Sequence, residues 1–217
     1  SNTKLIFGEI IGNPGLEIMD VPEVANIAHD AGIPLIIDAT FNTPYLCKSL
    51  DLGADIVVHS LTKWMCGHGT SMGGILVEGG KFDWKQNNKF PTMTEPYPGY
   101  HGLSFAEEFG PMAFTMRARA EGMRDIGPCM SPTNAFNILQ GIETLSVRME
   151  KHLSNAKKML EYLTHHEGVE WIAPGSRAYT WSAAKRSTNP IEISISKAPT
   201  LSRLALEIQP GEIARCD

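Results

Sequence analysis

A lysine and an aspartate each follow an apolar segment near the start of the 217-residue chain. Asp38 ends the apolar run 34–38, and Lys63 comes shortly after the run 55–60. An unprotonated lysine amine forms an imine with a carbonyl compound. A carboxylate suits a protonated pyridine nitrogen, and a charged pyridinium is a strong electron sink for a carbanion. The two residue types together indicate a cofactor that carries both a carbonyl group and a pyridine ring.

Hydroxyl groups and glycines surround this lysine. Ser60 and Thr62 flank it with alternating spacing, so both could point to one side and hold a phosphate. The glycine-rich segment 67–74 follows, and glycine lets the backbone approach a cofactor without a Cβ clash. Each piece alone is a weak signal, because a Ser-x-Thr-Lys stretch is usually a surface loop and Asp38 could cap a helix. The combination predicts pyridoxal phosphate bound to Lys63 as a Schiff base.

Apolar runs and helical patterns alternate around these residues. Strands are predicted at 5–11, 34–38, 55–60 and 74–78, and helices at 21–31 and 45–53. This alternation is typical of an α/β fold with a mainly parallel sheet covered on both faces. Ligands of such sheets lie outside the carboxyl ends of the strands. Asp38 and the segment 60–63 occupy those ends, so we expect them to lie close together.

The second half of the chain is predicted to be mainly helical. Residues 81–100 are rich in Asn, Pro, Gly and Thr and indicate a long loop, which is often functional. Residues 105–126 have a helical pattern, and 134–163 form one long helix or two. An apolar stripe on the latter is interpreted as core packing: Ile138, Ile142, Leu145, Met149, Leu153, Ala156 and Leu160. Alternation at 191–195 predicts a strand.

Composition excludes several classes of protein. The chain is 42% hydrophobic and 20% charged, which suits one globular domain with part of a second. A net charge of -5 without a basic cluster argues against nucleic-acid binding. No apolar run approaches the roughly 18 residues that a membrane helix needs, and no signal peptide is recognised, so a soluble cytosolic protein is expected. The scattered cysteines predict free thiols, without a disulfide framework or metal site: Cys47, Cys66, Cys129 and Cys216.

The histidines have ordinary structural interpretations. His59 is expected to pack at a strand end, and His68, in the glycine-rich turn, to contact a neighbouring group. His165 and His166 are expected at a solvated helix end, because adjacent residues do not share a helix face.

Two segments resemble the signature blocks of a known family. Residues 38–44 and 59–64 are similar to blocks of the cystathionine/methionine-metabolism group of pyridoxal phosphate enzymes, which have the aspartate-aminotransferase fold. Glu9 followed by 12–14 resembles that group's upstream block. The resemblance implies that Lys63 is the Schiff-base lysine and that Asp38 pairs with the pyridine nitrogen.

The same resemblance assigns the remaining site residues. It implies that Ser60 and Thr62 bind the phosphate and that Asn13 lies near the substrate carboxylate. The family also uses an arginine to clamp that carboxylate. The chain has four arginines after residue 172, none in a recognisable family context, so none is assigned: Arg177, Arg186, Arg203 and Arg215.

A narrower similarity points to O-acetylhomoserine sulfhydrylases. It is carried by residues 91–96, 100–103, 124–128, 131–136 and 139–145. It implies γ-replacement on O-acetylhomoserine with sulfide or a thiol, giving homocysteine or methionine plus acetate, in a homotetramer. Cystathionine γ-synthase, cystathionine γ-lyase and methionine γ-lyase activities remain as alternatives, as does a truncated relative without turnover.

The resemblance covers about residues 3–172 and divides the chain. Residues 1–130 are predicted to be part of the large cofactor-binding domain. Residues 131–172 are a long helical connection to the small domain, and 173–217 are a divergent tail. The N-terminal part of the family, with its phosphate loop and the aromatic residue that stacks on the pyridine ring, is expected to be missing.

Overall fold

The computed structural model describes residues 2–13, 16–169, 171–172 and 193–194. The predicted strand at 191–195 is confirmed for its described part, since β6 (Ile193–Ser194) pairs antiparallel with β5 (Trp171–Ile172). The four arginines after residue 172 and Cys216 lie outside the described residues. Within the described part of the chain, no helix is both long enough and apolar enough to cross a membrane.

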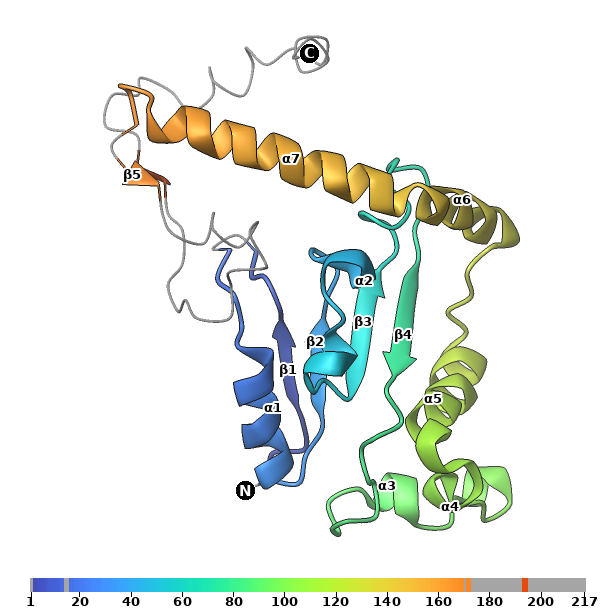
Figure 1. The fold of residues 1–217 in the computed structure, drawn as a ribbon. Helices are drawn as coiled ribbons and strands as arrows, with labels where there is room; N and C mark the ends of the chain where they lie inside the picture. The colour runs from blue at the N-terminus through green and yellow to red at the C-terminus, as the bar shows by residue number, and fades with distance from the viewer. Residues whose placement is uncertain (1, 14–15, 170, 173–192, 195–217) are drawn as a thin grey trace.

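A four-stranded sheet forms the centre of the first half (Figure 1). Its order is β1 (Ile6–Glu9), β2 (Leu35–Asp38), β3 (Ile56–Ser60) and β4 (Gly74–Glu78). β1, β2 and β3 are parallel, and β4 runs antiparallel to β3. The four predicted strands and the mainly parallel arrangement are confirmed, with half of the strand ends trimmed by one or two residues.

Helix α1 (Val21–Asp30) covers one face of this sheet. It begins where the Asp20 carboxylate accepts a hydrogen bond from the Glu23 amide, and a proline occupies its first turn. Its apolar side, with Val21, Ala25 and Ala28, is buried. The helix ends before Gly32, whose φ of +63° favours glycine.

Successive side chains of β2 and β3 point to opposite faces of the sheet, and apolar residues are packed on both faces. Leu35 and Ile37 are fully buried on one face. Ile36 and Ile56, adjacent in register, lie on the other face beside aromatic residues of the following segment. Both faces of these strands are therefore covered, as predicted.

Strand β4 departs from that expectation. Ile75, Leu76 and Val77 are 42%, 37% and 37% exposed. The strand is an edge of the described sheet and pairs only with β3 among the described residues, and α5 (Ala113–Arg117) packs beside it without covering it. The prediction of a sheet covered on both faces is wrong for β4.

The predicted helix 45–53 is two short elements. They are α2 (Thr43–Leu46) and the 3-10 helix η1 (Ser49–Leu52). Cys47 between them is extended, with φ of -147° and ψ of 123°, and its buried side chain anchors the break. Gly53 ends the second element in the left-handed region, as its position predicts.

The region 105–126, predicted to have a helical pattern, is built from several consecutive helical elements. It consists of α4 (Phe105–Phe109), η3 (Gly110–Met112), α5 and the π-helix η4 (Ala118–Ile126). Gly110 has a φ of +48°, and Pro111 after it lacks the amide that a continuous helix would use. The helical pattern predicted for this range is therefore confirmed, and these two residues divide it into successive short elements.

The long helical region is two helices, one of the two possibilities left open. α6 (Pro132–Glu143) begins where the Ser131 hydroxyl accepts from the Asn134 amide, and α7 (Leu145–Thr164) follows directly. Figure 1 shows α7 running across the sheet edge at which β1, β2 and β3 end. The predicted stripe is buried at Ile138, Leu145 and Met149, and only half-buried at Leu153, Ala156 and Leu160.

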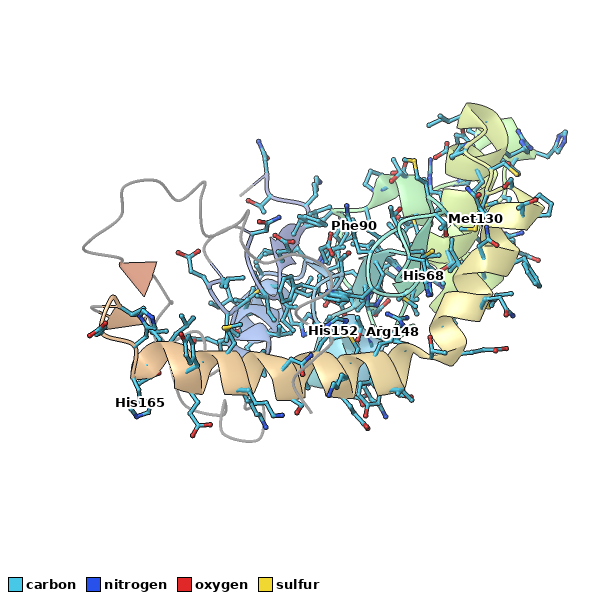
Figure 2. The ribbon with its side chains drawn as sticks, turned by 90° about the horizontal axis from the view of Figure 1, so that it is seen from above. His68, Phe90, Met130, Arg148, His152 and His165 are labelled. Atoms are coloured by element: carbon cyan, nitrogen blue, oxygen red, sulfur yellow. The ribbon has the colours of Figure 1, made fainter. Side chains whose placement is uncertain are left out.

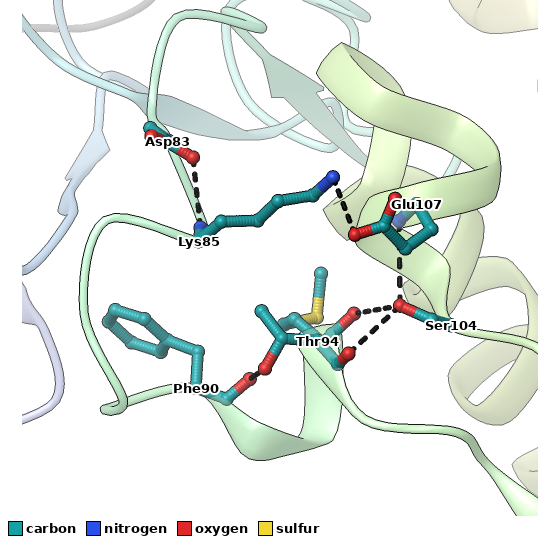
Figure 3. A network of polar contacts seen from close by, with 7 residues as sticks. Asp83, Lys85, Phe90, Thr94, Ser104 and Glu107 are labelled. Atoms are coloured by element: carbon teal, nitrogen blue, oxygen red, sulfur yellow. Dashed lines mark hydrogen bonds and ion pairs between the residues drawn. The ribbon is translucent and has the colours of Figure 1, made fainter.

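The segment predicted as a long loop is held by its own polar contacts (Figure 3). It contains α3 (Pro91–Thr94) and η2 (Pro98–Tyr100). The Thr94 hydroxyl donates to the Phe90 carbonyl at 3.1 Å, and the Ser104 hydroxyl donates to the Thr94 carbonyl at 3.1 Å. An ion pair of 2.8 Å between Lys85 and Glu107 links the segment to α4.

Candidate active site

The sheet brings the predicted site residues to one edge. Glu9 and Asp38 are neighbours in the register of β1 and β2, and both end their strands. Asp38 is paired with Val58 of β3, so Ser60 lies two residues further at the same edge. Gly74, opposite Ser60, begins the antiparallel strand there. The predicted placement of these groups at the carboxyl ends of parallel strands is confirmed.

The half-buried Asp38 carboxylate is held by the backbone that follows it. Its Oδ1 accepts from the amide of Thr40 at 2.8 Å. Such a short-range contact orients a carboxylate at a strand end. Its Oδ2 has no hydrogen-bond partner among the residues that the structure describes. One oxygen is therefore fixed, and the other remains available to a donor outside the sheet.

Thr40 joins the two signature segments. Its hydroxyl oxygen accepts from the amide of Ser60 at 2.7 Å. A second link joins the same segments, because the His59 ring Nδ1 lies 3.0 Å from the carbonyl oxygen of Ala39. The relative positions of Asp38 and Ser60 are thus fixed by two contacts beyond the strand ladder. Thr40 was not singled out from the sequence, although it lies two residues after Asp38 in the same segment.

Replacement of Thr40 tests this link. Thr40→Val keeps the shape but leaves the half-buried Ser60 amide without its acceptor, so we expect a loss of about 1–3 kcal/mol in the free energy of unfolding. Thr40→Ser keeps the hydroxyl and is the matched control. The measurement is denaturant unfolding at equal protein concentration. Equal stability of the valine and serine variants would show that the Thr40 hydroxyl does not hold the two segments together.

His59 packs at the strand end, as predicted. It is 7% exposed. Burial lowers its pKa below the ordinary value of 6.5, while the hydrogen bond to Ala39 and the charge of Asp38 oppose that shift. The ring is therefore neutral near pH 7 and serves the packing of the edge. His68 does contact a neighbouring group, since its Nδ1 lies 2.7 Å from the carbonyl oxygen of Cys66.

Thr62 is engaged with the residue before β4. Its hydroxyl accepts from the amide of Gly73 at 3.1 Å and lies 3.3 Å from the Gly73 carbonyl oxygen, to which it donates. A hydroxyl has only one proton to donate. Thr62 would therefore have to release the Gly73 carbonyl in order to donate to any other group, whereas the Ser60 hydroxyl has no competing partner among the described residues.

Lys63 presents an accessible amine in the turn after β3. The residue is exposed, and its side chain has no ion pair or hydrogen bond with the described part of the chain. Its backbone is fixed, because its amide donates to the Ser60 carbonyl at 3.3 Å and its carbonyl accepts from the Gly67 amide at 2.7 Å. An exposed amine on a held backbone is what covalent capture of a carbonyl compound requires.

Asn13 lies beyond the end of β1, at the same edge. Its backbone amide donates to the Glu9 Oε2 at 3.3 Å, and the residue is exposed. The Asn13 side chain has no hydrogen-bond partner among the described residues, so it is available to a ligand. The neighbouring Glu9 lies beside Asp38 in the strand register, which places a second carboxylate at the edge.

A distinct hollow of about 370 Å³ lies away from this edge. Lys4, Leu5 and Pro34 contribute to its wall, and they precede β1 and β2. It is therefore at the amino ends of the strands, on the side where Trp84 and Phe90 cover the sheet. The residues with the chemistry of a carbonyl cofactor are at the opposite ends, so the hollow does not mark their site.

The sequence is similar to known proteins over most of its length. It matches the family described as Cys/Met metabolism PLP-dependent enzyme over residues 1–189. It is 50% identical over 178 residues to the O-acetyl-L-homoserine sulfhydrylase of Leptospira meyeri, covering 78% of this chain and 40% of that protein. It is 48% identical over 181 residues to the homocysteine synthase of Schizosaccharomyces pombe, covering 82% and 42%.

A solved structure shares the fold. It is described as an O-acetylhomoserine (thiol)-lyase of Campylobacter jejuni with a pyridoxyl-lysine monophosphate, and it aligns with a TM-score of 0.73 and 38% identity over 78% of this chain and 42% of that one. The chain spans about 40% of the length of the curated relatives it matches. The fold is that of the aspartate-aminotransferase-like enzymes, as predicted. The chain belongs to the Cys/Met metabolism family of enzymes that depend on pyridoxal phosphate.

Proposed function

We propose that the protein containing this chain catalyses γ-replacement on O-acetylhomoserine. Sulfide or a thiol would replace the acetyl ester at Cγ, giving homocysteine or methionine and releasing acetate. The observation that carries the proposal is the meeting of Asp38 and the Lys63 turn at one sheet edge, fixed by the contact of Thr40 with Ser60. Identities of 50% and 48% to a sulfhydrylase and a homocysteine synthase support the choice of substrate class.

The described residues fit pyridoxal phosphate on three observations. The amine of Lys63 is accessible, and the Asp38 Oδ2 has no partner within the described residues. The hydroxyl of Ser60 is likewise available among those residues for a phosphate oxygen. We assign Lys63 to covalent attachment, Asp38 to the pyridine nitrogen, and Ser60 to the phosphate, with Thr62 as a second phosphate donor.

Lys63 also has a role in proton transfer in this proposal. When bound, the cofactor supplies an electron sink for the negative charge that develops on the substrate carbon. The Lys63 amine would be the base that accepts one proton from Cα and one from Cβ and later returns one to each of these carbons. Asp38 holds its charge next to the pyridine nitrogen, and Asn13 orients the substrate carboxylate.

The arrangement of the whole protein is part of the same proposal. Residues 1–130 would belong to the large cofactor-binding domain, 131–172 would connect it to the small domain, and 173–217 would form a divergent tail. We further propose a cytoplasmic homotetramer, as the resemblance to the O-acetylhomoserine sulfhydrylases implies. The break of the long helical region at Thr144, between α6 and α7, is compatible with a connection that starts within this segment.

A substrate panel separates this activity from its alternatives. We expect O-acetylhomoserine with sulfide to yield homocysteine and acetate, with cystathionine and methionine turned over far more slowly. The assay quantifies acetate and thiol products for each substrate in the same preparation. Cleavage of cystathionine alone would assign the protein to the lyases of this family.

The remaining alternative is a relative without turnover. Binding of pyridoxal phosphate without any product in the panel would support that alternative and exclude the proposed activity.

A further inference from the structure

The turn that carries Lys63, residues 61–66, is closed by backbone hydrogen bonds. The Cys66 amide donates to the Leu61 carbonyl at 2.9 Å, and the Gly67 amide donates to the Lys63 carbonyl at 2.7 Å. The last carbonyl groups of a helical turn have no partner within it. The carbonyls of Trp64 and Met65 are in that position, so they need donors from elsewhere in the chain.

Arg148 of α7 supplies those donors. Its Nη1 donates to the Trp64 carbonyl at 2.8 Å, and its Nη2 lies 3.5 Å from the Met65 carbonyl. The same Nη2 donates to the Gly141 carbonyl of α6 at 2.7 Å. The Nε donates to the Thr144 hydroxyl at 3.1 Å. One guanidinium thus joins the turn of Lys63 to both helices of the long helical region.

Two glycines make room for this contact. A methyl group on Gly67, whose φ is +79°, would overlap the Arg148 guanidinium. A methyl group on Gly141 would overlap the carbonyl oxygens of Met65 and Cys66. The turn and the end of α6 therefore meet backbone to backbone, with Arg148 in the remaining space. Close packing of this kind leaves little freedom for the turn to move.

Further contacts place the first half of α7 against the same region. The His152 ring centroid is 4.7 Å from that of Trp64, and the Glu150 carboxylate accepts from the Tyr45 hydroxyl. Figure 2 shows Arg148 and His152 near each other on the side of α7 that faces the sheet, whereas His165 lies at the other end of the helix. Within the described residues, the hydrogen bonds and ring contact from α7 to the Lys63 turn come from Arg148 and His152, in the first turns of the helix.

We propose that Arg148 is a positioning residue for Lys63, which it serves by fixing the carbonyls of the turn rather than by touching the reacting atoms. The inference rests on the proposed function, in which Lys63 attaches the cofactor. A guanidinium can hold three carbonyls and a hydroxyl at once, because its donors are arranged in a rigid plane. A lysine ammonium at this position cannot span the same set of acceptors.

The test compares four variants of the purified full chain. Arg148→Ala removes the guanidinium, and Arg148→Lys keeps only the charge. Met149→Ala removes a buried side chain of the same helix and leaves Arg148 in place, and Lys151→Ala changes an exposed residue nearby. The first readout is amide hydrogen exchange of the peptide 61–67 without cofactor. The second is the fraction of borohydride-trapped pyridoxyl label at Lys63, measured by mass spectrometry over a titration of pyridoxal phosphate.

For Arg148→Ala we expect exchange of 61–67 to become about tenfold faster or more, and the concentration of pyridoxal phosphate that gives half-maximal label at Lys63 to rise about tenfold, because several charged hydrogen bonds are lost. For Arg148→Lys, both the exchange rate and the half-maximal concentration should lie between the values for Arg148→Ala and for the unchanged protein. Met149→Ala should lower the unfolding midpoint without a selective change in the peptide 61–67. Lys151→Ala should change neither readout.

The positioning role would be overturned if Arg148→Ala and Met149→Ala, compared at matched loss of stability, changed the exchange of 61–67 and the labelling of Lys63 equally. Absence of label at Lys63 in the unchanged protein would overturn the proposed function and, with it, a role of Arg148 in cofactor attachment. The exchange of 61–67 distinguishes these two failures. It is measured without cofactor and reports whether Arg148 stabilises the turn.

Discussion

Lys63→Ala is expected to abolish covalent attachment of pyridoxal phosphate and to reduce turnover of O-acetylhomoserine about a thousandfold or more, the order of loss seen when a residue of a catalytic unit is removed. Lys63 is the amine at this edge that is both exposed and held by its backbone. No imine can form without it, and the proposed proton transfer at Cα loses its base. Visible absorbance after addition of the cofactor, and borohydride trapping followed by mass spectrometry, measure the attachment directly.

Two variants control for charge and folding. Lys63→Arg keeps the positive charge but cannot form the covalent link, so it should fail as completely as Lys63→Ala. Lys151→Ala removes another exposed lysine and should retain full attachment. Thermal unfolding of the Lys63 variants should be nearly unchanged, because the exposed side chain makes no ion pair or hydrogen bond within the described residues. A pyridoxyl label retained at a different lysine in Lys63→Ala would disprove the site assignment.

Asp38→Asn is expected to lower kcat about a hundredfold or more while pyridoxal phosphate still attaches to Lys63. Asparagine keeps the oxygen that accepts from the Thr40 amide, so the local backbone should be preserved. It removes the negative charge that would keep the pyridine nitrogen protonated, and the loss of one aligned electrostatic contact in an active site costs about 100- to 1,000-fold in kcat. Steady-state kinetics with O-acetylhomoserine and sulfide, together with the label at Lys63, separate turnover from attachment.

The neighbouring carboxylate provides the matched control. Glu9 is adjacent to Asp38 in the strand register and also exposes a carboxylate at the edge. Glu9→Gln removes a charge at the same end of the strands as Asp38. It keeps a side-chain oxygen that can accept a hydrogen bond from the Asn13 amide. It should change kcat far less than Asp38→Asn. Equal losses of kcat in the two variants would mean that turnover depends on the net charge at this edge and not on a specific pairing of Asp38.

The strands and the position of the site follow from local patterns in the sequence. Each strand is a short apolar run with turn residues nearby, and β2 ends at Asp38 as the run itself does. Local backbone chemistry divides two of the predicted helical regions into shorter elements. The Gly110-Pro111 pair interrupts the region 105–126, and the extended backbone of Cys47 divides α2 from η1. Apolar periodicity alone does not report such breaks, because the burial pattern continues across them.

The contacts that hold the site together are harder to predict from sequence. Asp38, Ser60, Thr62 and Lys63 carry recognisable chemistry next to apolar runs, so their residue types identify them. Thr40 and Arg148 act through partners 20 and 84 residues away. Their importance depends on the strand register and on where α7 crosses the sheet edge. Neither is set by a local spacing rule, so only the folded structure identifies these residues.

The exposed apolar residues of β4 affect how the protein should be handled. Ile75, Leu76 and Val77 form an uninterrupted apolar stretch on an edge strand of the described sheet. The free backbone groups of such an edge are a template for a strand from another molecule, which leads to aggregation. Refolding yield should therefore fall as protein concentration rises, and the kinetic and binding comparisons need dilute samples checked by light scattering. A charged residue at position 76 would be the simplest change that discourages such pairing.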